Sequence, residues 1–258
     1  MINLKGKNIL IMGAAGRLGF AIVQKCLEYD CKNVFLSDFN EADLISKSKK
    51  INVKKFQRIH LIKSDITNEK EIIDLLEKCK KLVPIIDGAV QCAYPRSAGW
   101  GTKIENLRQE DLQEDLNSQL GGSIIFSKHI MKLFVDQKRG SLVHISSIMG
   151  INAPKFYNYE GTEMHSPIEY TAIKAAIIAI TKWLAKYYFN KGVRVNCVSP
   201  GGILDKQNQK FLDKYRLSCN NIGMLNSSDL SDAIVFLLSD VSRAVTGQNL
   251  IIDDGWSL

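Results

Sequence analysis

The sequence predicts a doubly wound α/β fold, in which helices cover both faces of a parallel sheet. Short apolar runs alternate with longer amphipathic segments along most of the 258 residues, which is the pattern of repeated strand and helix units. The first apolar run, Asn8 to Met12, leads into three glycines, Gly13, Gly16 and Gly19, at the start of a predicted helix. No linker rich in proline, serine or glycine and no internal repeat divides the chain. We therefore expect one domain over residues 1–258.

Each predicted strand is a run of apolar or β-branched residues bounded by turn formers. In order, the predicted strands are Asn8–Met12, Asn33–Ser37, Ile59–Lys63, Ile86–Cys92, Ser141–Ile145, Val193–Val198 and Asn249–Ile252. Each predicted helix carries apolar residues three or four apart, as Ile72, Leu76 and Cys79 do. The predicted helices begin with one near Arg17, followed by Glu41–Lys50, Glu69–Leu82, Asn106–Phe134, Tyr170–Phe189, Phe211–Arg216 and Asp229–Ser239.

Three of these helices have further features. Asn106–Phe134 is long, and we expect a kink near Gly121 and Gly122. Tyr170–Phe189 is apolar nearly all round, which suits burial against the sheet and a partner subunit, or burial within one chain. Ser227 or Ser228 is expected to cap the helix that begins at Asp229.

The glycine turn and the acid after the second strand together indicate a dinucleotide site. Missing side chains at Gly13, Gly16 and Gly19 permit a tight turn, a close approach of the backbone to a pyrophosphate, and close packing of helix on strand. The helix N-terminus that follows favours phosphate groups. Three glycines alone also fit an ordinary strand-to-helix turn. However, Asp38 lies about 20 residues further on, where an acid can bond ribose hydroxyls.

Composition argues against several other classes of function. The net charge of +7 comes mainly from lysines scattered along predicted helices, which indicates a solvated basic surface and no nucleic-acid site. The six cysteines form no CxxC pair and the four histidines lie far apart, so we expect neither a metal site nor disulfides. No secretory h-region and no apolar run of about 20 residues is present, so we expect a cytoplasmic protein that spans no membrane.

Tyr170 and Lys174 are the best candidates for acid–base chemistry. Residues four apart on a helix share one face, so the ammonium can lie beside the phenol. A free phenol has a pKa of about 10, and a nearby cation brings it closer to neutrality. Ser147, at the end of a predicted strand, can hold a substrate carbonyl oxygen while the phenol donates a proton. Tyr187 and Lys191 have the same spacing, but no serine-bearing strand end precedes them, so we interpret that pair as structural.

Several motifs together resemble the short-chain dehydrogenases/reductases over essentially the whole chain. Besides the glycine turn and Asp38, the matching segments are SDIT at Ser64–Thr67, HISS at His144–Ser147, YTAIK at Tyr170–Lys174, NCVSPGG at Asn196–Gly202 and TGQNLIIDDG at Thr246–Gly255. The resemblance implies a Rossmann-type sheet of seven strands, a nicotinamide cofactor, and catalysis by Ser147, Tyr170 and Lys174. It also implies a homodimer or homotetramer.

The resemblance further assigns a set of residues to the cofactor. Asp65 and Ile66 are expected beside the adenine, and the backbone near Ile203 beside the carboxamide. The full expected set is Gly13, Ala15, Gly16, Arg17, Leu18, Gly19, Asp38, Phe39, Asp65, Ile66, Cys92, Ala93, Tyr170, Lys174, Pro200, Gly201 and Ile203. Because an acid after the second strand repels a 2′-phosphate, we expect NAD(H) to be preferred. NADP(H) is not excluded, because Arg17 could turn toward a phosphate.

The sequence departs from the family pattern at three places. The glycine turn is GxxGxxG in place of the commoner GxxxGxG, so Arg17 stands where the middle glycine is usual. The segment Gln91 to Tyr94 replaces the usual NNAG. Gln119 falls at the position of the fourth catalytic residue, usually Asn, which holds a water linked to the active-site lysine. Asn117 is the weaker candidate for that role.

The chain between Ser147 and Tyr170 is longer than the family usually shows, which gives an active-site insert at about residues 152–168. We expect this insert to form a wall of the substrate site, with a solvent loop as the alternative, and a substrate lid at about residues 203–222. The expected substrate residues are Tyr94, Arg96, Tyr157, Tyr159, Glu160 and Lys206, with Thr162, His165, Lys210, Lys214 and Arg216 as further candidates. The cations among them favour an anionic substrate.

The insert, with AYPR at Ala93–Arg96 and SPGGILDKQ at Ser199–Gln207, resembles a flagellin-modification subgroup of bacterial surface-glycan pathways. This implies a sugar-type substrate from a nonulosonic acid or nucleotide-sugar pathway. The leading hypothesis is reversible hydride transfer between NAD(H) and a sugar carbinol or ketone. The alternatives are an epimerase or dehydratase with tightly bound, recycled NAD, and a non-catalytic NAD-binding subunit.

Overall fold

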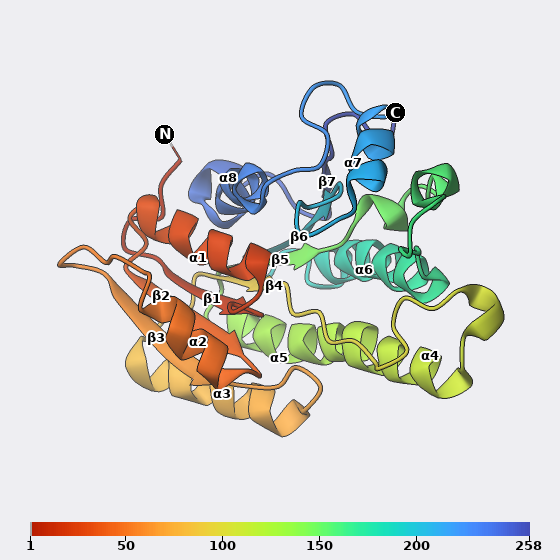
Figure 1. Ribbon diagram of the computed structural model, residues 1–258. Helices are drawn as coiled ribbons and strands as arrows, with labels where there is room; N and C mark the ends of the chain where they lie inside the picture. The colour runs from red at the N-terminus through yellow and green to blue at the C-terminus, as the bar shows by residue number, and fades with distance from the viewer. Residues whose placement is uncertain (1) are drawn as a thin grey trace.

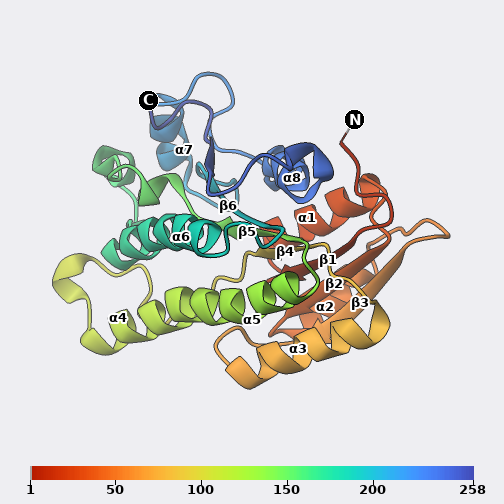
Figure 2. The same cartoon turned by 180° about the vertical axis from the view of Figure 1, so that it is seen from behind.

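A seven-stranded parallel sheet forms the centre of the computed structural model, which describes residues 2–258 (Figures 1 and 2). The spatial order of the strands is β3-β2-β1-β4-β5-β6-β7, and every neighbouring pair is parallel. The strands are β1 (Asn8–Met12), β2 (Asn33–Asp38), β3 (Arg58–Lys63), β4 (Gly88–Gln91), β5 (Gly140–Ile145), β6 (Val193–Pro200) and β7 (Asn249–Ile252). The sheet confirms the predicted fold class.

All seven predicted strands are present, and they differ from expectation only at their ends. The largest difference is at β4, which begins at Gly88 although the apolar run starts at Ile86. The reason is that the Gln137 side chain bonds both to the Ile86 nitrogen, at 3.2 Å, and to its carbonyl oxygen. That amide takes the place of a neighbouring strand at this position.

Helices cover both faces of the sheet. They are α1 (Arg17–Glu28), α2 (Glu41–Ser48), α3 (Glu69–Leu82), α4 (Gln109–Asp115), α5 (Gly122–Asp136), α6 (Ile168–Tyr187), α7 (Gln209–Arg216) and α8 (Ser227–Leu238). Among residues 2–258, no helix combines the length and the apolar character that a membrane crossing requires.

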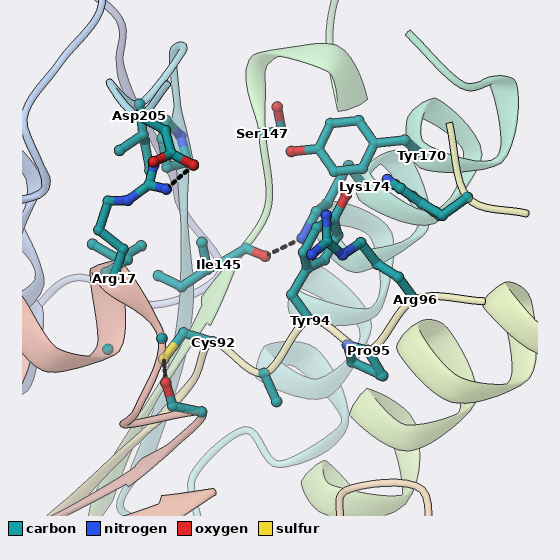
Figure 3. Close-up of a pocket in the computed structure, with 18 of the residues that line it drawn as sticks. Arg17, Cys92, Tyr94, Pro95, Arg96, Ile145, Ser147, Tyr170, Lys174 and Asp205 are labelled. Carbon is teal, nitrogen blue, oxygen red and sulfur yellow. Dashed lines mark hydrogen bonds and ion pairs between the residues drawn. The ribbon is translucent and has the colours of Figure 1, made fainter. Parts of the chain in front are cut away.

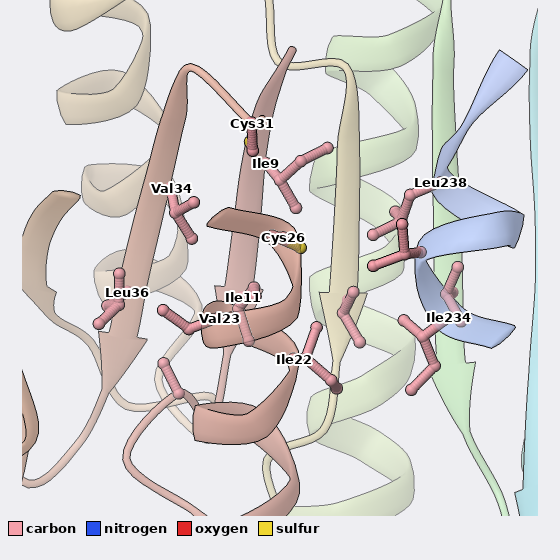
Figure 4. Packing of buried hydrophobic residues seen from close by; sticks show 14 of the residues in the cluster. Ile9, Ile11, Ile22, Val23, Cys26, Cys31, Val34, Leu36, Ile234 and Leu238 are labelled. Atoms are coloured by element: carbon pink, nitrogen blue, oxygen red, sulfur yellow. The ribbon is translucent and has the colours of Figure 1, made fainter. Parts of the chain in front are cut away.

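Successive side chains of β1 point to opposite faces of the sheet, as in any pleated strand. Ile9 and Ile11 belong to a core cluster with α1 and α8, where Ile22 and Ile234 are buried (Figure 4). Leu10 belongs to the opposite cluster, which packs against α3, α5 and α6. Because the strand is covered on both sides, its sequence is a continuous apolar run.

The long helix predicted over Asn106–Phe134 is in fact three consecutive segments. α4 runs into one π-helical stretch, η2 (Leu116–Gly121), which continues as α5 from Gly122. The predicted irregularity near Gly121 is therefore present, as a widened turn. Such π segments often occur at functional sites.

The insert (residues 152–168) and the lid (residues 203–222) pack together over a third, smaller core. This core contains Phe211 and Tyr215 of α7 and the fully buried Trp256 near the C-terminus. The ring of Tyr159, in the short 3₁₀ helix η4 (Phe156–Tyr159), lies 5.1 Å from the ring of Phe211. The insert is thus anchored on the lid.

One predicted cap was wrong. α8 begins at Ser227, and its N-cap is Asn226, where a capping box joins the Asn226 and Asp229 side chains to each other's backbone nitrogens. Asn ranks with Ser among favoured caps, so residue preference alone could not choose between them.

The order of the strands reverses between β1 and β4, where the chain leaves neighbouring strands toward opposite faces. In parallel sheets this reversal opens a crevice at the carboxyl ends of the strands. The turn after β1 passes so close to β4 that a Cβ on Gly13 would lie 2.6 Å from the Ala93 nitrogen. Gly13 also has a φ of +85°, a value that side chains disfavour.

We expect Gly13→Ala to destabilise the fold by at least about 2 kcal/mol, since overpacking and left-handed strain add. Urea unfolding measures the loss. Gly161→Ala is the matched control, because Gly161 has a φ of +74° but no heavy atom within 4 Å of its Cβ position. It should cost only about 1 kcal/mol. Equal losses would mean that the β1–β4 approach relaxes without cost.

Candidate active site

A cavity of about 1110 Å³ runs along the carboxyl edge of the sheet. The glycine turn and Asp38, which follow β1 and end β2, line one part of it, and Ser147 and Tyr170 line the part beyond β5, where Figure 3 shows them together. Every residue predicted to contact the cofactor lines this cavity. The volume exceeds the upper end of the range usual for a single small ligand, about 1,000 Å³, so a cofactor and a substrate can be held together.

The glycine-turn end fits a dinucleotide. α1 begins at Arg17 without a side-chain cap and without an acid in its first turn, so its N-terminal N–H groups are available to phosphate. Asp38 accepts a hydrogen bond from the Ala15 nitrogen at 3.0 Å and another from the Asn40 nitrogen at 3.2 Å. These bonds hold the carboxylate at the end of β2, beside the turn, where a ribose would lie. Phe39, next to it, is exposed and carries no charge.

Ser147, Tyr170 and Lys174 meet at the other end. Ser147 follows β5 and caps a 3₁₀ turn, where its hydroxyl accepts a hydrogen bond from the Met149 nitrogen at 3.2 Å. The phenol oxygen of Tyr170 points toward Ser147, whose side chain lowers the pKa of the phenol (Figure 3). Lys174, one turn along α6, donates to the Ile145 carbonyl oxygen at 3.1 Å. Strand β5 and helix α6 therefore position the three groups.

Burial controls the ionisation of this trio. Desolvation lowers the pKa of Lys174 to about 8, because the ammonium is almost entirely removed from water. Burial also raises the pKa of the Tyr170 phenol, and the bond to Ser147 opposes that rise. At neutral pH the phenol is thus a proton donor beside a lysine that still carries its charge.

Aromatic rings surround the phenol. The rings of Tyr94 and Trp100 each lie 5.8 Å from the ring of Tyr170 and 5.3 Å from one another, all edge to face. The guanidinium of Arg96 lies over Tyr94 at 5.7 Å. Trp100 was not identified from the sequence, since it lies in an irregular loop that matches no motif.

Buried carboxylates fix this loop on α4. Asp115 accepts hydrogen bonds from the nitrogen and the hydroxyl of Ser97, at 2.7 and 2.8 Å, and Asp111 accepts from the Gly99 nitrogen at 3.2 Å. The loop therefore presents Arg96 and Trp100 to the cavity from a rigid support.

Gln119 lies in the π-helical segment and is only 2% exposed. Its side-chain oxygen and nitrogen both have no hydrogen-bond partner among residues 2–258, and it does not line the main cavity. The alternative, Asn117, is exposed and also lies outside the cavity lining. A buried amide with both atoms unpaired requires an explanation, most simply a bound water.

The predicted substrate residues divide into two groups. Tyr94, Arg96 and Tyr159 line the cavity, as His165 does, whereas Tyr157, Glu160 and Lys206 lie outside it. The structure thus does not bring these last three to the cavity, and the fold of the insert explains two of them.

The η4 turn directs Tyr157 and Glu160 toward the lid. The Tyr157 hydroxyl bonds to Ser218 at 2.8 Å, and Lys214 donates to the carbonyl oxygens of Tyr157 and Glu160, at 2.8 and 3.1 Å. These groups hold the insert to α7.

The pKa of Lys174 predicts a distinctive pH dependence of stability. Between pH 8 and about 10.4 the unfolded chain keeps a proton that the folded chain has lost, so folding becomes more favourable as pH rises. We expect the free energy of unfolding of wild type, relative to Lys174→Met, to rise by about 1.4 kcal/mol per pH unit in this window. Urea unfolding across the window measures it. Lys186→Met, an exposed lysine of the same helix, should show a flat difference. A flat difference for Lys174→Met would refute the shifted pKa.

Comparison with known proteins supports the same interpretation. Residues 13–257 match a family model described as enoyl-(acyl carrier protein) reductase. The chain is 43% identical to a post-translational flagellin modification protein A of Campylobacter coli, over 99% of this chain and 100% of that protein. It is 28% identical to a 3-oxoacyl-[acyl-carrier-protein] reductase of Rickettsia felis, over 99% of this chain and 98% of that protein.

Among solved structures, a short chain dehydrogenase from Leptospira borgpetersenii with bound NAD+ superposes with a TM-score of 0.85. It is 31% identical, and the match covers 99% of this chain and 94% of that one. The sequence matches, the order of the strands, and the meeting of Ser147 with Tyr170 and Lys174 of α6 thus all indicate the same family. The chain belongs to the short-chain dehydrogenase/reductase family of NAD(P)-binding oxidoreductases.

Proposed function

We propose that this protein is an NAD(H)-dependent oxidoreductase that interconverts a carbinol and a ketone on an anionic, sugar-type small molecule. The observation that carries the proposal is the meeting of Ser147, Tyr170 and Lys174 at one end of a crevice whose other end fits a dinucleotide. The bound nicotinamide supplies or accepts the hydride. The chain's own residues handle the proton.

Tyr170 is the general acid in the reducing direction. Its phenol donates a proton to the substrate oxygen while Ser147 holds that oxygen in place, and the roles reverse on oxidation. The ammonium of Lys174 stabilises the phenolate that forms, and its remaining hydrogen-bond donors suit ribose hydroxyls. Gln119 takes the place of the usual Asn by holding a water behind Lys174, which accounts for its unpaired amide.

Asp38 supports a preference for NAD(H). Its carboxylate is fixed beside the glycine turn by two backbone nitrogens, where it bonds ribose hydroxyls and repels a 2′-phosphate. The NAD+-bound relative at 31% identity is consistent with this choice.

The substrate wall supports the substrate class. Tyr94, Trp100 and Tyr159 line the cavity with flat aromatic rings, and Arg96 adds a cation over the ring of Tyr94. This combination suits the faces of a sugar ring that bears a carboxylate or phosphate. The 43% identical flagellin-modification relative supports a place in a surface-glycan pathway, acting on a nonulosonic acid or a nucleotide sugar.

We extend the proposal to a cytoplasmic homodimer or homotetramer. On α6 the exposed rings of Trp183 and Tyr187 stack 4.6 Å apart, an apolar surface that a second copy could cover.

A second candidate function is an epimerase or dehydratase that retains and recycles its NAD. One contact favours it: Arg17 pairs with Asp205 across the crevice, which would hinder cofactor release. Stoichiometric NADH release during turnover would exclude this candidate.

Cofactor preference is tested by fluorescence titration with NADH and NADPH. We expect wild type to prefer NADH, and Asp38→Asn to bind NADPH about tenfold more tightly than wild type does, because the charge is lost while an acceptor for the Ala15 nitrogen remains. Unchanged NADPH affinity in the variant would mean that Asp38 does not select the cofactor.

Substrate class is tested by screening acidic and neutral sugars with NAD. We expect turnover of acidic sugars, and Arg96→Gln to raise their KM about tenfold while kcat stays similar, because the charge-assisted bond forms in ground and transition states alike. Tyr170→Phe is the chemical control, and its turnover should fall by about 10² to 10⁴-fold. An unchanged KM for Arg96→Gln would contradict the anionic substrate.

A further inference from the structure

Arg17 joins two segments that lie on opposite sides of the cofactor crevice. Its guanidinium donates a hydrogen bond from Nη1 to the Leu204 carbonyl oxygen at 2.9 Å and pairs through Nη2 with the Asp205 carboxylate (Figure 3). Both Arg17 and Asp205 line the main cavity. The sequence indicates that Arg17 could turn toward a phosphate. In the structure it turns to the lid.

The pair bridges the carboxyl edge of the sheet. Arg17 is the first residue of α1, directly after the glycine turn that follows β1, and Asp205 follows β6. Strands β4 and β5 lie between β1 and β6, whereas Asp38 ends β2 and Ser147 follows β5. A dinucleotide that extends along this edge from Asp38 to Ser147 therefore has to pass the bridge between Arg17 and Asp205.

The lid side of the bridge is a formed turn. The Leu204 nitrogen donates to the Leu225 carbonyl oxygen at 2.8 Å, which adds Leu204 to a short parallel bridge at Ile203. The Asp205 nitrogen donates to the Gln207 side chain at 2.6 Å, and that side chain donates to the Ile203 carbonyl oxygen at 2.9 Å. Asp205 is therefore presented by a structured loop to a helix terminus that is itself fixed.

We propose that Arg17 and Asp205 form a latch over the bound dinucleotide, which opens when the cofactor leaves. The inference rests on the proposed NAD(H) function. It gives Asp205 an unexpected role, because an isolated carboxylate near a pyrophosphate repels it, whereas a carboxylate that closes the latch retains it. The two possibilities predict effects of opposite sign for the loss of Asp205.

The test is the rate of NADH dissociation, measured by stopped-flow displacement and NADH fluorescence. We expect Arg17→Gln and Asp205→Ala each to release NADH about two- to fivefold faster than wild type, the range for a half-exposed ion pair. The double variant should be no faster than the faster single variant, since each change removes the same contact. Added salt should narrow the difference between wild type and variants.

Lys54→Gln is the matched control. It breaks the Lys54–Asp30 pair, whose side chains are 55% and 42% exposed against 46% and 50% for Arg17 and Asp205, and neither residue lines the cavity. Its NADH release should match wild type.

The outcomes separate the latch from the proposed function. If wild type binds NADH but Asp205→Ala releases it at the same rate or more slowly, the latch is overturned and the oxidoreductase proposal stands. If Arg17 instead serves a 2′-phosphate, Asp205→Ala tightens NADPH binding without changing NADH release, which also overturns the latch. A wild-type protein that binds neither nucleotide overturns both proposals.

Discussion

Where β1 ends, its backbone comes so close to the residues after β4 that Gly13 has no room for a side chain. The chain leaves β1 toward the face covered by α1 and leaves β4 toward the face covered by α5, so the two turns separate directly beyond this point. The resulting crevice receives the phosphate-binding turn from one strand and the loop that carries Tyr94 from the other. The proposed cofactor site and the proposed substrate wall thus both depend on one close contact between neighbouring strands.

The side of the crevice that holds Ser147 and Tyr170 depends on a second close contact, between α6 and the segment that follows β5. The Ser146 hydroxyl donates to the Lys174 carbonyl oxygen at 2.7 Å, and a Cβ on Gly150 would lie 2.6 Å from the Lys174 carbonyl carbon. The helix is therefore held against the strand at the residue whose ammonium is buried. Burying that charge is costly, and one carbonyl bond offsets only part of the cost, so the chain tolerates a lysine here whose pKa is lowered. Ribose hydroxyls that accept hydrogen bonds from this ammonium would offset the rest of that cost.

The sheet, most helices and the meeting of Ser147, Tyr170 and Lys174 could be predicted from the sequence, because each depends on local pattern or on motif spacing. An irregularity near Gly121 was expected from the glycines, but its form, a π-helical segment that contains Gln119, could not be predicted, since the residues before Gly121 have the pattern of an ordinary helix. The position of Trp100 beside Tyr170 could not be predicted either. It depends on Asp111 and Asp115 of α4, which bind the backbone of the loop that carries Trp100. The sequence also suggests that polar residues of the insert contact the substrate. Composition does not show which way the side chains of a 3₁₀ turn point, however, and the Tyr157 side chain points to the lid.

The shared core of insert and lid also affects how specificity can change in this scaffold. The ring of Tyr159 packs on Phe211, and Lys214 donates a hydrogen bond to the Tyr157 carbonyl oxygen. The ammonium of Lys155 lies over the ring of Trp256 at 4.5 Å. The insert is therefore not a structural unit that can be exchanged by itself. Transplanting it onto a relative would leave aromatic rings and carbonyls without their counterparts, so both segments and the C-terminal tryptophan would have to be exchanged together. When substrate choice changes among natural relatives, we expect changes in the insert to be accompanied by changes in the lid.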